Sequence, residues 1–166
     1  MARAPESPFR FVVSDLLAEA GRRRVERLSA PVSWALEMSA PVPGSELSAE
    51  ATFESALGGI FVRCEATVPY RSTCHRCLVE WDHDETVAVT EMIGEGADYE
   101  LDGDVADLEP VLRDAVLGAL SDSPTCRDDC RGLCAVCGAD LNTDPCPGHD
   151  DEPDGPFAVL RDLLEP

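Results

Sequence analysis

Apolar and polar residues alternate strictly over much of the segment 46–93, and this period of two predicts long, half-buried β-strands. Leu47, Ala49, Ala51 and Phe53 recur on one side of the first strand. Gly58-Gly59 supplies a tight hairpin turn, residues 61–70 form the return strand, and a third strand runs from about 79 to 93. We therefore expect an α+β fold: a curled antiparallel sheet or partial β-barrel with a few helices over its open face.

A helix is predicted directly after the acidic, glycine-rich loop 94–107. Asp107 is placed to cap the helix, and Pro110 fits its first turn. Apolar residues then repeat at intervals of three and four, which is typical of a helix face that packs on a core: Leu108, Val111, Leu112, Ala115, Val116, Ala119 and Leu120. A second, short amphipathic helix is expected over 157–164, near the end of the chain.

The N-terminal segment predicts a short strand over 9–13 and a short helix over 15–20. Ser14 is the expected N-cap, and Gly21 is the expected end of the helix. A basic run, Arg22-Arg23-Arg24, follows. The run has two interpretations: a solvated strand edge whose charge prevents pairing with other chains, or a patch that contacts the phosphates of RNA.

Charge is distributed unevenly over the 166 residues, whose net charge is −20. Residues 1–80 are nearly neutral, and residues 81–166 carry almost all the negative charge. The acidic half should repel nucleic acid and attract basic partners. No apolar run approaches the ~20 residues of a membrane span, and the start of the sequence does not resemble a secretory signal. We expect a cytoplasmic protein with a sheet domain (1–122), a cysteine-rich knuckle (123–149) and an acidic linker with a C-terminal helix (150–166).

Four cysteines lie within the twelve residues from Cys126 to Cys137, at the spacing C-x3-C-x3-C-x2-C. Structural Zn²⁺ takes four such thiolates in a tetrahedron at ~2.3 Å. The sequence thus predicts a closed zinc site at Cys126, Cys130, Cys134 and Cys137, where Gly138 permits the tight exit from the last knuckle. Cys146 is an alternative ligand, and His149 also competes for a place.

Disulfides are the main alternative, because eight cysteines is an even number. In a reducing compartment, however, clustered cysteines indicate metal or redox chemistry more often than disulfides. A catalytic zinc site fits less well, since such sites usually keep an open position and use His or Glu ligands.

A second C-x2-C pair, Cys74-His75-Arg76-Cys77, connects the second and third long strands. Three interpretations of this segment remain open: a structural turn with inward-facing sulfurs, a metal or redox pair, or a loop that contacts a partner through His75 and Arg76.

In their order, these parts resemble the YceD family, the large-ribosomal-subunit RNA accumulation proteins of bacteria and plastids. The similarity covers about residues 9–164. Its most specific parts are the C-x-R-C-L turn at Cys74 to Leu78 and the segment D-C-x-G-L-C-x-x-C-G that starts at Asp129. Where many members end the cysteine cluster with a C-x-C pair, this sequence has Cys146-Pro147-Gly148-His149.

The resemblance implies a non-enzymatic, cytoplasmic role in making or protecting large-subunit ribosomal RNA. Expected partners are the ribosomal RNA precursor or basic ribosome-assembly proteins, with no membrane and no small-molecule substrate. A thiol redox protein that uses Cys74 and Cys77 is the main alternative function. A zinc-dependent hydrolase is weaker, for lack of His and Glu ligands.

Overall fold

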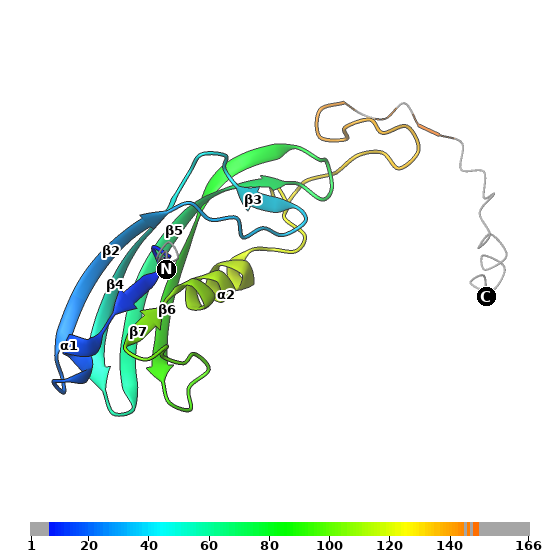
Figure 1. Cartoon of the computed structure of the whole chain (residues 1–166). Helices are drawn as coiled ribbons and strands as arrows, with labels where there is room; N and C mark the ends of the chain where they lie inside the picture. Colours follow the sequence, from blue (N-terminus) through cyan, green and yellow to red (C-terminus); the bar gives the residue numbers. More distant parts are fainter. Residues whose placement is uncertain (1–6, 145, 147, 150–166) are drawn as a thin grey trace, which may run out of the picture.

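A computed structural model describes residues 7–144, 146, 148 and 149 of the chain. Its main element is a five-stranded antiparallel sheet (Figure 1). The sheet contains β2 (Arg23–Ala30), β3 (Ser39–Pro41), β4 (Leu47–Ala56), β5 (Gly59–Thr73) and β6 (Glu80–Gly94). β5 is central: it pairs with β4 and β3 on one side and with β6 on the other, and β2 continues the sheet beyond β4. The predicted curled sheet and its long hairpins are confirmed.

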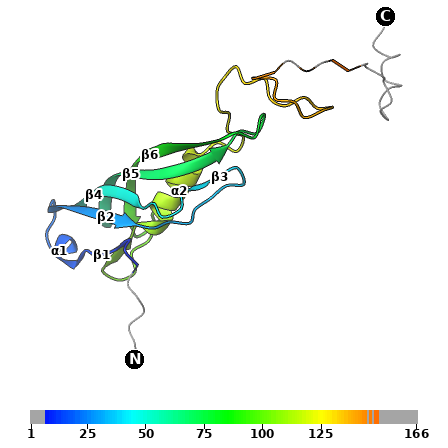
Figure 2. The same cartoon turned by 90° about the horizontal axis from the view of Figure 1, so that it is seen from above.

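The two faces of the sheet follow the alternation in the sequence. Ala51 and Phe53 of β4 and Val62 and Val68 of β5 are fully buried on the concave face. The residues that alternate with the buried ones, such as Glu50, Arg63 and Glu65, lie on the exposed convex face. The sheet curves as a whole, so the concave side is a hollow that other elements fill (Figure 2).

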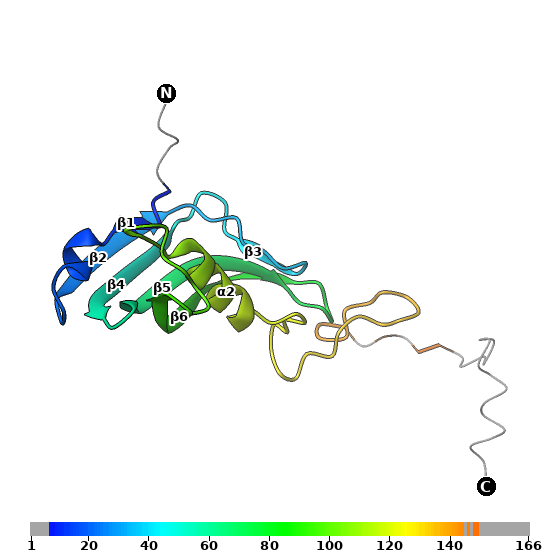
Figure 3. The ribbon, with the colours of Figure 1, turned by 60° about the horizontal axis from the view of Figure 1, so that its bottom comes forward.

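α2 (Glu109–Ala119) fills the half of this hollow next to β6 (Figure 3). Its predicted apolar stripe is buried at Val111, Leu112 and Val116, although Ala119 at the end of the stripe is exposed. The predicted cap is displaced by one residue: the N-cap is Leu108, which has no side-chain cap, and Asp107 before it accepts the Glu109 N–H through Oδ1 at 2.9 Å. The apolar pattern thus identified the helix and its buried side correctly.

The other half of the hollow is filled by an arrangement that the sequence analysis did not predict. β1 (Arg10–Val12) pairs with β7 (Val105–Asp107), which lies inside the segment expected to be an acidic loop. α1 (Ser14–Leu17) follows β1 and buries Leu16. The predicted cap was wrong: Val13 precedes the helix and no side chain caps it. The helix is also shorter than expected, since it ends before Ala18.

Aromatic packing joins this second layer to the sheet. Phe11 of β1 lies 5.1 Å from Phe53 of β4 between ring centroids, and Phe9 lies 5.7 Å from Trp34. The buried Tyr70 hydroxyl donates to the Trp34 carbonyl at 2.6 Å, and burial raises the pKa of Tyr70 to about 12. A single core therefore runs beneath both covering layers.

Within the described residues, no helix is long and apolar enough to cross a membrane. The helix predicted over 157–164 and the linker before it lie outside the described residues.

Candidate metal centres

Two short segments of the chain adopt the same turn. In the β5–β6 connection, the Cys74 N–H donates to the Val79 carbonyl at 2.9 Å and the Leu78 N–H donates to the Cys74 carbonyl at 2.9 Å. In the C-terminal segment, the Cys134 N–H donates to the Ala139 carbonyl at 2.8 Å and the Gly138 N–H donates to the Cys134 carbonyl at 2.9 Å. Each turn therefore presents a C-x2-C pair from one rigid frame, which is the geometry of a metal knuckle.

The residue after the second cysteine is left-handed in both turns. Gly138 has φ 73°, as expected for a tight exit, and Leu78 adopts φ 61°. Leu78 is the one non-glycine residue with positive φ among those described. Such a backbone costs about 1–2 kcal/mol for an L-residue with a Cβ, so the surroundings of the first knuckle must hold it in place.

The inner cluster consists of Cys74, Cys77, Cys126 and Cys130, whose sulfurs all lie within 4.8 Å of one another. Cys74 and Cys130 approach to 3.9 Å, and Cys77 and Cys126 to 3.7 Å, between sulfurs. Four sulfurs at ~2.3 Å from a central ion would be about 3.8 Å apart, whereas a disulfide requires about 2.05 Å. The spacing suits a tetrahedral metal ion and excludes a bonded pair.

The outer cluster consists of Cys134, Cys137, Cys146 and His149. Cys137 and Cys146 lie 3.8 Å apart between sulfurs, and Cys146 lies 3.0 Å from the His149 Nε2. Three thiols and one imidazole form another common donor set for structural zinc. This cluster is more exposed than the inner one, in which Cys74 and Cys130 are buried.

The grouping differs from the predicted one. The four cysteines expected to share one ion are divided: Cys126 and Cys130 join the hairpin turn, and Cys134 and Cys137 join Cys146 and His149. The reason is topological: the segment that follows the C-terminal end of α2 lies beside the β5–β6 turn. A signal in the sequence could have shown this. Apart from Cys64, which is buried within the sheet, seven cysteines and His149 supply two complete sets of four.

Each cluster favours a negative charge on one sulfur. Burial disfavours the Cys74 thiolate, but the backbone N–H groups of Cys126, Cys77 and Arg76 outweigh it and lower the Cys74 pKa to about 6. Burial and the neighbouring sulfurs raise the pKa of Cys126 to about 12. In the outer cluster, the N–H groups of Cys137 and Val136 lower the pKa of Cys134 to about 6. A second thiol in each cluster, Cys126 and Cys146, has its pKa raised beside this thiolate, and a divalent cation would remove that conflict.

Several contacts attach the C-terminal segment to the hairpin turn besides the sulfurs. Both the backbone N–H and the ring Nδ1 of His75 lie 3.0 Å from the Pro124 carbonyl oxygen. The Arg76 guanidinium donates to the Cys130 carbonyl at 3.1 Å, and the Arg76 carbonyl accepts the Leu133 N–H at 3.1 Å. One interpretation of the sequence is that His75 and Arg76 contact a partner. They are exposed, yet each is engaged within this attachment.

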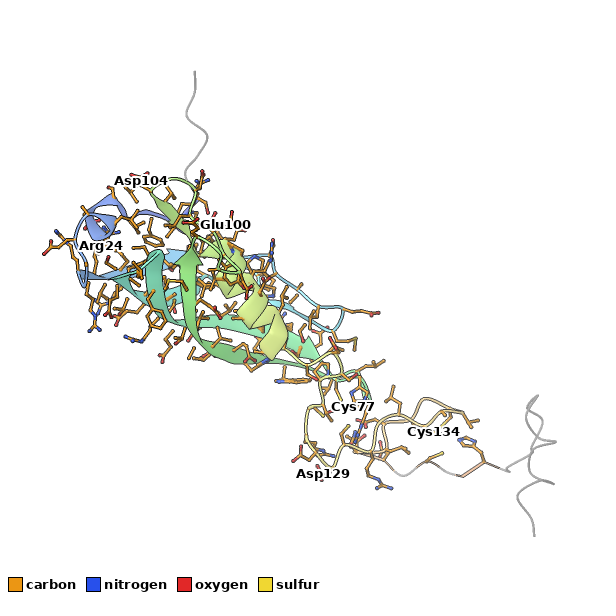
Figure 4. All side chains as sticks on the ribbon, turned by 90° about the horizontal axis from the view of Figure 1, so that it is seen from below. Arg24, Cys77, Glu100, Asp104, Asp129 and Cys134 are labelled. Atoms are coloured by element: carbon orange, nitrogen blue, oxygen red, sulfur yellow. The ribbon has the colours of Figure 1, made fainter. Side chains whose placement is uncertain are left out.

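The basic run lies at the opposite end of the sheet from both clusters. Figure 4 shows Arg24 there, far from Cys77 and Cys134. Its three arginines are ion-paired: Arg22 with Glu19 at 3.1 Å, Arg23 with Glu54 at 2.9 Å, and Arg24 with Asp15 at 2.8 Å. Because β2 is an edge strand and these charges are matched, the arrangement favours the solvated-edge interpretation over a phosphate patch.

Fold and site together define a curled-sheet protein whose longest hairpin is joined at its tip to a cysteine-rich C-terminal segment. Comparison with known families gives this class a name. The family described as "Large ribosomal RNA subunit accumulation protein YceD" matches residues 62–164. The chain belongs to the YceD family, as the sequence motifs indicated.

Relatives from mycobacteria extend the similarity toward the N-terminus. An uncharacterized protein of Mycobacterium tuberculosis is 33% identical over 153 residues, which cover 85% of this chain and 73% of the relative. An uncharacterized protein of Mycobacterium leprae is 33% identical over 137 residues, which cover 74% of this chain and 61% of that protein. No solved structure matches the chain.

Proposed function

We propose that this chain is a non-enzymatic factor in large-subunit ribosomal RNA accumulation and ribosome biogenesis, and that it carries two structural Zn²⁺ ions. The observation that carries the proposal is the inner cluster. It joins the C-x-R-C-L turn to the C-terminal cysteine segment in a single donor set, and both lie within the residues that the family matches. In this account, the metal holds together the part of the molecule that carries the family's most specific motifs.

Zinc is the metal that these donors fit best. Thiolate and imidazole ligands are soft or borderline, and four sulfurs, or three sulfurs and one nitrogen, in a tetrahedron are typical of structural Zn²⁺. Inner ligands come from chain positions about fifty residues apart. A bound ion would therefore fix the long segment between them as well as the local turn.

A non-enzymatic role is supported by the same donor sets. Each cluster offers four protein ligands, so a bound ion would keep no open position for a substrate or an activated water. The remaining alternative is thiol redox chemistry at Cys74 and Cys77, for which the low pKa of Cys74 is the favourable observation. Against it, Cys126 and Cys130 lie in direct contact with this pair.

The partner in this proposal is a basic protein of the ribosome-assembly machinery, in the cytoplasm, with precursor RNA reached through that protein. Support comes from the negative charge of residues 81–166 and from the matched charges of the basic run. Acidic surface repels the phosphate backbone, whereas it attracts Lys- and Arg-rich chains.

Complementation of a strain that lacks the protein tests the proposal, scored by the amount of mature large-subunit RNA and by co-sedimentation with precursor subunits. Cys130→Ser should fail to restore the RNA, and Cys64→Ser, the matched control outside both clusters, should restore it. Unchanged RNA in the deletion strain would overturn the role. If Cys74→Ser and Cys77→Ser abolish function while Cys126→Ser and Cys130→Ser do not, the redox alternative replaces the metal account.

A further inference from the structure

The β6 edge of the sheet is open along most of its length. β6 pairs with β5 over all fifteen residues on one side. On the other side, within the described part of the chain, backbone pairing occurs only at its C-terminal end, where Ile93 bridges Tyr99 and the Gly94 N–H donates to the Tyr99 carbonyl. Figure 2 shows β6 at the rim of the sheet. A long, unpaired strand edge is a template for another strand.

The ladder determines which residues of β6 face outward. In an antiparallel pair, alternate residues bond to the neighbouring strand, and the residues between them point away. At one end of the hairpin the Cys74 N–H bonds to the Val79 carbonyl, and at the other the Glu95 N–H bonds to the Gly58 carbonyl. The register is constant between these ends. The odd-numbered residues of β6 therefore bond to β5. The even-numbered residues from Glu80 to Met92 point their N–H and C=O groups away from β5, where none of the described residues pairs with them.

The charge of this edge is of one sign. β6 carries five carboxylates and no Lys or Arg: Glu80, Asp82, Asp84, Glu85 and Glu91. Asp82 is bonded to Arg71 of β5 at 2.6 Å, and ion pairs for the other four are absent from the described residues. Edge carboxylates prevent the same edge of a second copy from pairing here, since like charges would meet. The same carboxylates would favour a strand that carries positive charge.

Beyond α2, the concave side of β6 offers room for the side chains of an added strand. A groove of about 390 Å³ lies there, between Trp81, His83 and Glu85 of β6 and the chain around Leu120 and Pro124. The rings of Trp81 and His83 stack with centroids 6.0 Å apart, and the His83 Nδ1 is shielded without a hydrogen-bond partner in the described residues. An indole face beside a carboxylate suits a cationic or amphipathic side chain.

We propose that the open edge of β6 binds an extended, basic peptide segment as an additional antiparallel or parallel strand. Backbone hydrogen bonds to the even-numbered residues supply the affinity, and Lys or Arg at every second position of the peptide meets the carboxylates of Glu80 and Asp84. The intervening side chains enter the groove beside Trp81. This inference names the class of partner in the proposed function, and it rests on that function for the claim that the peptide belongs to a ribosome-assembly protein. The addition of a strand is tested separately, on the purified protein.

The test is a binding titration of the metal-loaded full chain with a fluorescent nine-residue peptide that alternates Arg with Val and Thr. Thr86→Pro removes one outward N–H, while the hydrogen bonds between β5 and β6 are kept. It should weaken binding by about tenfold, which corresponds roughly to the loss of one hydrogen bond. Thr86→Val is the matched control. It loses the same 2.9 Å hydroxyl contact to Thr67 but keeps the N–H, and it should bind like the wild type.

Charge is tested separately with variants of equal net charge. Glu80→Gln/Asp84→Asn should weaken binding several-fold and flatten its salt dependence, while Glu46→Gln/Asp104→Asn, two exposed carboxylates outside β5 and β6, should leave it nearly unchanged. Equal loss in both pairs, or equal affinity of Thr86→Pro and wild type, would overturn the proposal. So would tighter binding of a single-stranded RNA of similar length, which would assign the edge to nucleic acid.

Amide hydrogen exchange gives a signature that is independent of affinity. On peptide addition, the even-numbered amides of Thr86, Ala88 and Thr90 should gain protection, and the odd-numbered amides between them should not change, because β5 already protects them. Protection confined to residues outside β6 would place the peptide elsewhere and refute strand addition. If this signature appears while ribosomal RNA is normal in the deletion strain, the binding site stands and the proposed function fails.

Discussion

Replacing Gly132 by Ala should loosen the attachment of the C-terminal segment to the hairpin turn. Gly132 has φ 76°, a backbone that costs an L-residue about 1–2 kcal/mol. A Cβ there would also lie 3.1 Å from the Arg76 carbonyl oxygen. That oxygen accepts the Leu133 N–H, so the Cβ would disturb a bond worth about 0.5–1.5 kcal/mol.

An alanine stiffens the unfolded chain, which offsets about 0.4–1 kcal/mol of this loss. The net expectation is a weakening of about 1–2 kcal/mol in the local free energy of opening. Two matched glycines calibrate this value. Gly138→Ala has the same left-handed strain but nothing within 4 Å of the added Cβ, and it should cost less. Gly118→Ala lies within α2, also has open space, and should stabilise by about 0.5–1 kcal/mol.

The assay is amide hydrogen exchange of the metal-loaded protein, read at Leu133 and at Leu141, whose N–H donates to the Gly132 carbonyl at 3.0 Å. In Gly132→Ala, exchange at both amides should accelerate by about tenfold, while the amides of β4 and β5 stay unchanged. If Gly132→Ala behaves like Gly118→Ala, the attachment at Arg76 does not hold the segment and the reasoning is refuted.

Other predictions concern side chains outside this attachment. Burial raises the pKa of Cys64 to about 11. Alkylation at pH 8 should therefore spare Cys64 in the folded protein, even after a chelator has removed any bound metal. Modification of Cys64 before the protein unfolds would contradict its buried position. The Cys64 thiol ionises at a lower pH in the unfolded chain than in the folded protein, so the free energy of unfolding should fall as the pH rises from about 9 to 11. In denaturant titrations, this fall should be smaller for Cys64→Ala. Arg23→Ser should cost less than about 1 kcal/mol in urea unfolding, since its pair with Glu54 is exposed, and should leave association with ribosomal RNA unchanged; a weakened, less salt-dependent association would restore the phosphate interpretation. Leu78→Gly should keep the inner metal, as Gly138 occupies the equivalent place in the other knuckle, and loss of that metal in elemental analysis would refute the equivalence.

Local patterns predicted the long elements of this fold well. Period-two alternation identified β4, β5 and β6 because one face of each is buried and the other is solvated. The stripe of α2 was equally clear. Pairing of β1 with β7 was missed, since three-residue strands about ninety residues apart carry no periodic signal and are formed by tertiary packing.

The candidate site was predicted in its chemistry but not in its grouping. Every cysteine and histidine of both clusters was a candidate ligand, yet nearness in sequence suggested that Cys126 to Cys137 would share one ion. Distance along the chain does not predict distance in space here, because the tip of the long β5–β6 hairpin lies beside the segment that follows α2. Cys74 and Cys77 belong to the inner cluster for this reason.

Metal content of the purified protein tests the central claim most directly. The account predicts two zinc ions per wild-type chain, one in Cys74→Ser, one in Cys137→Ser, and none in the variant that carries both changes, with Cys64→Ser retaining two. A single site formed by Cys126, Cys130, Cys134 and Cys137 would instead give one ion in the wild type and one in Cys74→Ser. That result would contradict the bridge between the hairpin turn and the C-terminal segment.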